Sequence, residues 1–142
     1  MSERHASEVL PPHSIEAEHA VLASLMVNPE AMAAIRPLLT PAMFFRTINA
    51  DVYIAILSAS QRYGHINMIT VAHELAQKGK LDDVGGLRFL STIITNLMTA
   101  GGSEAYAAII RECAQRRAQI ARGSEMVRGG YIGNIGKGGI GL

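Results

Sequence analysis

Residues 81–122 read LDDVGGLRFLSTIITNLMTAGGSEAYAAIIRECAQRRAQIAR, two apolar runs separated by a break at Gly101-Gly102. In both runs, large apolar side chains recur at steps of three or four residues, the spacing that places them on one stripe of a helix. A link as short as residues 99–102 is typical of two antiparallel helices. The stretch therefore predicts a helical hairpin over residues 86–122, whose apolar stripe needs a further surface to pack against.

Upstream of the hairpin, start and stop signals divide the chain into short helices. Ser14, Asn28 and Thr70 stand where helix N-caps are expected, and Gly64 and Gly79 stand where helices end. The strongest helical period covers residues 48–63. The expected helices are 15–26, 29–35, 48–63 and 70–78, with a short element from Pro41 that carries Met43 and two core aromatics, Phe44 and Phe45.

The composition also favours helices. Of the 142 residues, 49% are hydrophobic but only 5% are aromatic, so the apolar content is mostly Ala, Ile, Leu and Met. We predict the all-α class: a globular helical bundle over residues 11–122 that ends in the antiparallel helical hairpin. We expect a disordered leader at residues 1–10. Residues 123–142 hold 8 of the 14 glycines and are expected to be a disordered tail.

Charge and cysteine content limit the partners and the cellular compartment expected of the protein. The net charge is +1, so no global field directs the chain to nucleic acid or an anionic membrane. The single cysteine, Cys113, cannot form an internal disulfide. Because the sequence has neither a signal peptide nor an apolar run long enough to span a bilayer, we expect a cytoplasmic protein with no membrane partner.

Residues that could carry chemistry are explained better by structural roles. The five histidines lack the spacing of helical metal ligands. Asp82 and Asp83 precede a helix, where the helix dipole favours acids. Gly136-Lys137 lacks the first glycine and the final Ser or Thr of a phosphate loop. We therefore expect no catalytic residue, cofactor or metal ion in this chain.

The last helix ends in several basic residues. Two interpretations remain open: the cations complement the helix dipole, or they contact an acidic partner surface or phosphate. No aromatic platform accompanies them, so direct DNA binding would be weak and independent of sequence. The basic residues are Arg111, Arg116, Arg117 and Arg122.

Three stretches together resemble one family, the N-terminal domain of DnaB-type replicative DNA helicases. The first is PPHSIEAEHAVL at residues 11–22, and the second runs from NPE at residue 28 to LTPAMF at residues 39–44. The third begins with VAHEL at residue 71 and continues through GKLDDVGGLRFL to residue 90 and then over residues 105–117. The resemblance covers residues 11–120. Ala23 and residues 47–49 depart from the family pattern.

The resemblance implies an oligomerisation and primase-docking domain of the primosome. Such domains pair through their hairpins as homodimers, build a hexameric collar, receive a DnaG-type primase and influence a helicase loader, with DNA contacted only indirectly. ATP, magnesium and the unwinding activity would belong to a motor domain, whose phosphate loop is not found in this sequence. For the hairpin seam and oligomer interface we predict Leu87, Leu90, Ile94, Tyr106, Ile110, Cys113 and Arg117.

Two alternatives follow from other classes of function. The chain could be a stand-alone or truncated regulator that co-assembles with a full-length helicase or competes for primase. It could also be a helical enzyme whose site forms between subunits. ATP hydrolysis by the purified chain would separate this enzyme from the other two.

Overall fold

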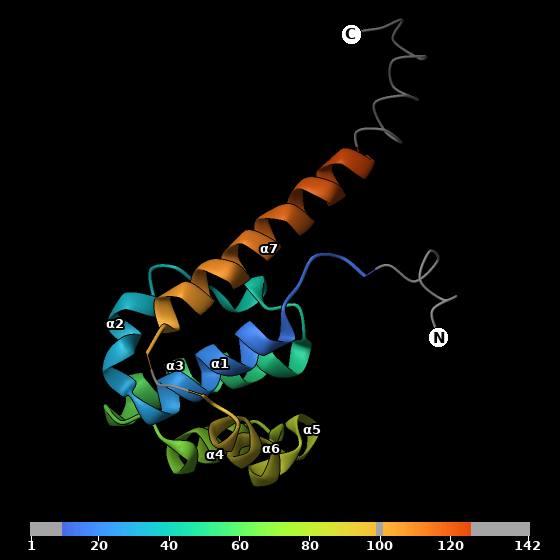
Figure 1. Cartoon of the computed structure of the whole chain (residues 1–142). Helices are drawn as coiled ribbons and strands as arrows, with labels where there is room; N and C mark the ends of the chain where they lie inside the picture. Colours follow the sequence, from blue (N-terminus) through green and yellow to red (C-terminus); the bar gives the residue numbers. More distant parts are fainter. Residues whose placement is uncertain (1–9, 99–100, 126–142) are drawn as a thin grey trace, which may run out of the picture.

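A computed structural model describes residues 10–98 and 101–125, and within these ranges the chain is helical with no strand (Figure 1). The all-helical class predicted from composition and spacing is therefore confirmed. In chain order the elements are α1 Ile15–Val27, η3 Pro29–Ala31, α2 Met32–Ile35, η4 Pro41–Met43, α3 Thr47–Tyr63, α4 Met68–Gln77, α5 Leu81–Val84, α6 Gly86–Thr95 and α7 Ser103–Glu125.

The helix α1 is the centre of the domain. Every residue from Val21 to Met26 is buried, so this part of the helix is enclosed on all sides and not only along one stripe. It packs against α3, α6 and α7, while α4 packs on α3 and contacts α5 and α6. A helical segment that is buried all round can be covered from several directions at once, which makes α1 the common surface for the rest of the fold.

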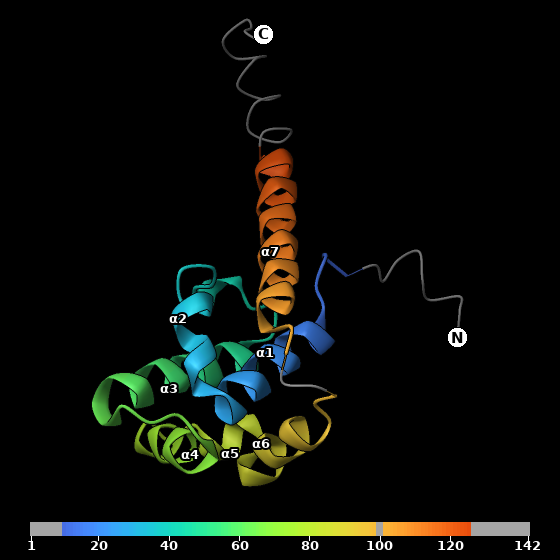
Figure 2. The ribbon, with the colours of Figure 1, turned by 60° about the vertical axis from the view of Figure 1, so that its left-hand side comes forward.

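The expected hairpin of α6 and α7 takes a different arrangement. The two helices follow one another in the chain, but each packs on α1 and they do not pack along one another. Figures 1 and 2 show α6 at one end of the bundle and α7 running away from it. The reason is that α1 offers the surface on which each of them packs; their buried apolar residues are Leu90 and Ile93 on α6 and Ala107 and Ile110 on α7.

Several predicted boundaries are confirmed and two are corrected. The Ser14 hydroxyl accepts a hydrogen bond of 3.1 Å from the Ala17 amide, as expected of the α1 N-cap. The cap of α4 is Asn67 and not Thr70, because the two side chains form a capping box and the helix begins at Met68. The helix α7 also continues to Glu125, past the expected start of the tail. The rest of that tail and the leader up to residue 9 lie outside the described residues.

Aromatic and polar groups complete the core. Phe44 is buried and lies against Tyr53, with 5.0 Å between the ring centroids, whereas Phe45 is only partly buried. The Tyr53 hydroxyl donates a hydrogen bond of 3.0 Å to the Leu39 carbonyl. Burial raises the pKa of this hydroxyl above its usual value, which keeps it a donor, although Arg36 acts in the opposite direction. The two predicted aromatics therefore have different roles, and only Phe44 belongs to the buried core.

Candidate protein-interaction surface

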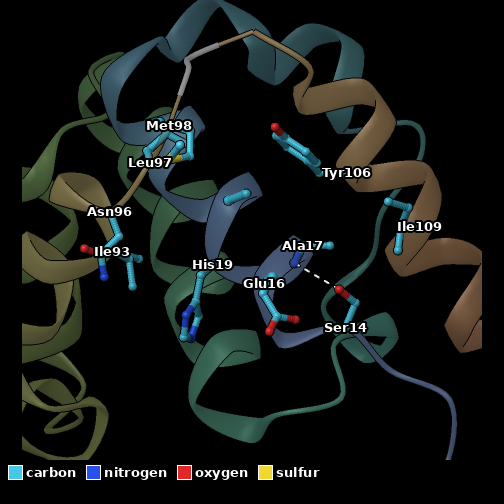
Figure 3. Close-up of a pocket in the computed structure, with 11 residues that line it drawn as sticks. Ser14, Glu16, Ala17, His19, Ile93, Asn96, Leu97, Met98, Tyr106 and Ile109 are labelled. Carbon is cyan, nitrogen blue, oxygen red and sulfur yellow. Dashed lines mark hydrogen bonds between the residues drawn. The ribbon is translucent and has the colours of Figure 1, made fainter.

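An open groove of about 450 Å³ lies where the start of α1, the end of α6 and the first turns of α7 meet (Figure 3). Its floor is α1, and the side chains of Tyr106 and Ile109 form the α7 wall. Apolar groups dominate the lining. The residues that line the groove are Ser14, Glu16, Ala17, His19, Ala20, Ile93, Asn96, Leu97, Met98, Tyr106 and Ile109.

The polar rim of the groove includes the half-buried His19. Its imidazole contacts the ring of Phe89 edge-on, with 5.3 Å between the centroids. Burial lowers the pKa of His19 from its usual 6.5; the charges of Glu18 and Glu16 raise it, and that of Arg46 lowers it further. At neutral pH the imidazole is therefore uncharged. The groove suits an apolar side chain with a polar or basic neighbour, because Glu16 is an exposed acid on its rim.

Arg117, in the second half of α7, fastens this helix to the body. Its guanidinium donates hydrogen bonds of 2.8 Å to the Pro12 carbonyl and 2.7 Å to the Met43 carbonyl. The same guanidinium lies 5.5 Å from the centroid of the Phe45 ring, on which His13 stacks at 4.1 Å. One side chain thus joins α7 to two segments that are distant in sequence, and this contact fixes the direction in which the helix leaves the body.

Beyond Arg117, α7 projects from the domain. All residues from 118 to 124 are exposed, and the views in Figures 1 and 2 agree that this part of the helix stands clear of the bundle. Ile120 lies there with 56% of its surface exposed. A lone helix gains little stability from its own hydrogen bonds, and most helices in proteins rely on packing. The projecting part of α7 is therefore a candidate contact surface.

The predicted seam residues fall into two groups. Leu90 and Ile110 have almost no exposed surface, and Arg117 is engaged by the carbonyls of Pro12 and Met43. These three form contacts within one chain and leave little surface for a second copy, so their place in an oligomer interface stays a prediction. The predicted seam residues with accessible surface are Leu87, which is 50% exposed, and Ile94, Tyr106 and Cys113, which are partly buried.

Other apolar residues of this surface were not among the predicted seam residues. Ile109 and Ile120 on α7 and Met98 before it are exposed, and Met98 and Ile109 also line the groove. A signal for two of them is present in the sequence. Tyr106, Ile109, Cys113 and Ile120 follow heptad spacing, which places them on one face of α7 that is distinct from the buried face.

Features that would indicate other kinds of site are missing from the described part of the chain. Residues 10–98 and 101–125 contain no group of three or more His, Cys, Asp or Glu side chains that could hold a metal ion. Asp82 and Asp83 are exposed in the first turn of α5, as helix-dipole reasoning expects. Gly136-Lys137 lies outside these ranges. Within the same ranges, no helix is long and apolar enough to cross a membrane.

The fold and the groove define an all-helical domain with an open apolar surface next to a projecting helix. Residues 10–112 match the family model described as the DnaB-like helicase N terminal domain, and the chain belongs to this family. A solved structure, the N-terminal domain of DnaB helicase from Mycobacterium tuberculosis, superposes with a TM-score of 0.83 at 35% identity and covers 87% of this chain and 89% of its own.

Full-length relatives are much longer than this chain. The replicative DNA helicase DnaB of Geobacillus stearothermophilus is 34% identical over 88% of the chain and 28% of its own length. The replicative DNA helicase DnaC of Bacillus subtilis is 34% identical over 86% of the chain and 27% of its own length. The chain thus spans about a quarter of these helicases and corresponds to their N-terminal region.

Proposed function

We propose that this domain is an assembly and docking module of a replicative DNA helicase, acting in the primosome during DNA replication in the cytoplasm. It would associate with further copies of itself toward a hexameric ring and receive a DnaG-type primase, with a helicase loader as a further partner. Unwinding would belong to a motor domain of the kind its longer relatives carry. ATP and magnesium would be bound there and not by this domain.

One observation carries the proposal: the helix α7 of this domain projects beyond its own body past Arg117. The exposed side chains Ile109 and Ile120 lie on this helix. An apolar surface of this kind on a small domain is typical of a contact with another protein. Family membership supports the choice of a replication protein as that partner.

The test of this proposal uses the purified 142-residue chain. Sedimentation over a wide concentration range should reveal self-association, and titration against the purified helicase-binding domain of a DnaG-type primase should reveal a complex. A chain that stays monomeric at every concentration, binds no primase and fails to join a full-length relative would contradict the proposal. ATP hydrolysis by the chain alone should be at background level, which separates this function from an enzyme with a shared site.

A further inference from the structure

The segment before α1 is extended and stiff. Pro11 and Pro12 fix their own backbone φ angles, and each restricts the residue before it to extended conformations. Leu10 and Pro11 are exposed, and Pro12 and His13 are only partly buried, so no side chain of this segment belongs to the core. The two prolines also have no N–H to donate. Residues 10–13 therefore form a strap that touches the body through few groups.

Two contacts hold the strap against the rest of the domain. The Pro12 carbonyl accepts a hydrogen bond of 2.8 Å from the Arg117 guanidinium, and these two residues are 105 positions apart. The His13 ring stacks on the Phe45 ring, with 4.1 Å between the centroids and 16° between the planes. The Arg117 guanidinium lies 5.5 Å from the centroid of the same Phe45 ring. The strap, Phe45 and Arg117 thus form one cluster, in which the segment before α1 meets α7.

The other members of the cluster are held independently of the strap. The backbone amide of Phe45 donates a hydrogen bond of 2.6 Å to the carboxylate of Glu18, which is buried. The Met43 carbonyl, which accepts a hydrogen bond of 2.7 Å from Arg117, belongs to the short helix η4. The strap is anchored at the following residue, Ser14, which caps α1. It is therefore the part of the cluster that can leave while the rest stays in place.

Release of the strap costs little free energy. The Arg117 side chain is only partly buried, so its hydrogen bond to Pro12 is exchanged for hydrogen bonds of both groups to water. The stacking of His13 on Phe45 is lost, but the strap regains the conformational entropy of its backbone. Because these contributions oppose each other and are of similar size, the attached and released states lie close in free energy.

We propose that the strap sets the direction of α7 and that its release lets the helix tilt. The first half of α7 stays packed through the buried residues Ala107 and Ile110, while Arg117 keeps its hydrogen bond to the Met43 carbonyl. Ile120 lies about 15 Å along the helix from Ile110, so a tilt of about 20° at Ile110 moves Ile120 by roughly 5 Å. The device acts within one chain and does not depend on the proposed assembly.

The strap connects the segment before α1 to the projecting part of α7. Figures 1 and 2 show it on the side of the bundle from which α7 leaves. A protein that binds this segment and draws it away also separates the Pro12 carbonyl from Arg117. The change reaches α7 without rearrangement of the core, because the strap contacts this helix directly. Occupation of the segment before α1 therefore controls where the projecting helix points.

Double electron–electron resonance tests the direction of α7. Spin labels are attached at Gln61→Cys in α3 and Ile120→Cys in α7, both exposed, in a chain that also carries Cys113→Ala. The labelled chain is measured at a concentration where sedimentation finds a monomer. Deletion of residues 2–13 removes the strap, keeps Ser14 as the cap, and should widen the distance distribution at least about twofold. Deletion of residues 2–9 keeps the strap and should leave the width unchanged.

A second variant changes the stiffness of the strap without shortening the chain. Pro11→Gly combined with Pro12→Gly keeps every carbonyl but gives the released strap more backbone freedom, so the distribution should widen in the same direction. The matched control is Ser7→Gly combined with Glu8→Gly, which should leave the width unchanged. Circular dichroism of all four variants should show the helicity of the unaltered chain, which distinguishes a tilt of α7 from unfolding.

Three outcomes would overturn the proposal. The first is a distance distribution of the same width with and without the strap. The second is widening by Arg117→Met but not by deletion of the strap, because the direction of α7 would then depend on the contacts with Met43 and Phe45 alone. The third is a loss of helicity in both strap variants, which would make the strap an essential part of the fold and not a releasable contact.

Discussion

The side-chain amide of Asn49 donates a hydrogen bond of 2.8 Å to the carboxylate of Glu18, and both residues are buried. The same carboxylate accepts hydrogen bonds from the backbone amides of Phe45 at 2.6 Å and Arg46 at 3.4 Å. These donors lie at the start of α3, which has no side-chain cap of its own. An acid of the first helix therefore orders the start of the third one, where the dipole also favours a negative charge.

Glu18→Ala should be strongly destabilising. It leaves the buried amide of Asn49 and two part-buried backbone amides without their acceptor and removes charge-assisted hydrogen bonds, at a cost of about 3 kcal/mol. Urea unfolding followed by circular dichroism measures this loss. The control is Glu16→Ala, on the exposed side of the same helix, which should change stability by less than about 0.5 kcal/mol. Equal losses for the two variants would mean that the Glu18 contacts do not stabilise the fold.

The sequence predicts most of the helices because their caps and periods are local properties. Ser14 and Gly64 mark the start of α1 and the end of α3, as expected. Asn67 was missed as the cap of α4, since its partner Thr70 carries the same kind of signal three residues later. For Glu18, the sequence predicts an acid that complements the dipole of its own helix. That its carboxylate serves a helix beginning at Thr47 depends on the tertiary fold.

The arrangement of α6 and α7 could not be predicted from their own sequences. Apolar spacing identifies the stripe that a helix buries but does not identify the surface that covers it. The decisive feature is in α1, whose run from Val21 to Met26 is buried throughout. A segment that is buried all round has no stripe that indicates its neighbours, and α1 accepts both α6 and α7. The sequence could therefore not predict that Leu90 and Ile110 are buried within one chain, while Tyr106 and Cys113 keep exposed surface.

Arg117→Met should loosen the attachment of α7. The variant retains much of the aliphatic stem but loses the hydrogen bonds to the carbonyls of Pro12 and Met43 and the cation over the Phe45 ring. We expect a loss of about 2 kcal/mol in the free energy of unfolding. Arg116→Met, measured at a concentration where the chain is monomeric, should cost less than about 0.5 kcal/mol because that residue is exposed.

His19 should make stability fall in mild acid. Because burial lowers the pKa of His19 in the folded state below its usual 6.5, the unfolded chain binds a proton more readily. The contribution of the uncharged imidazole is fully present above pH 6.5 and is lost as the pH falls toward the folded-state pKa. Urea midpoints at a series of pH values should therefore decrease below 6.5, and His19→Gln should reduce that decrease.

A matched substitution at an exposed histidine controls for the pH series. His65→Gln makes the same chemical change on the loop before α4, away from the groove. If His65→Gln reduced the acid-dependent loss as much as His19→Gln, burial at His19 would not be its cause.

Two glycines with left-handed backbone conformations should respond differently to the same substitution. Gly64 has a φ of 67° and a Cβ placed there would meet nothing within 4 Å, so Gly64→Ala should cost only backbone strain, about 1–2 kcal/mol. Gly85 has a φ of 108°, and its added Cβ would lie 2.9 Å from the Cβ of Phe89. Because that atom is tied to the backbone of α6 and cannot swing away, Gly85→Ala should cost about 1–3 kcal/mol more. Urea unfolding of the pair measures the difference. Equal losses would show that α6 shifts freely to relieve the contact. Such a shift would move Phe89 away from His19, and the urea midpoints of the pH series would then depend less on pH.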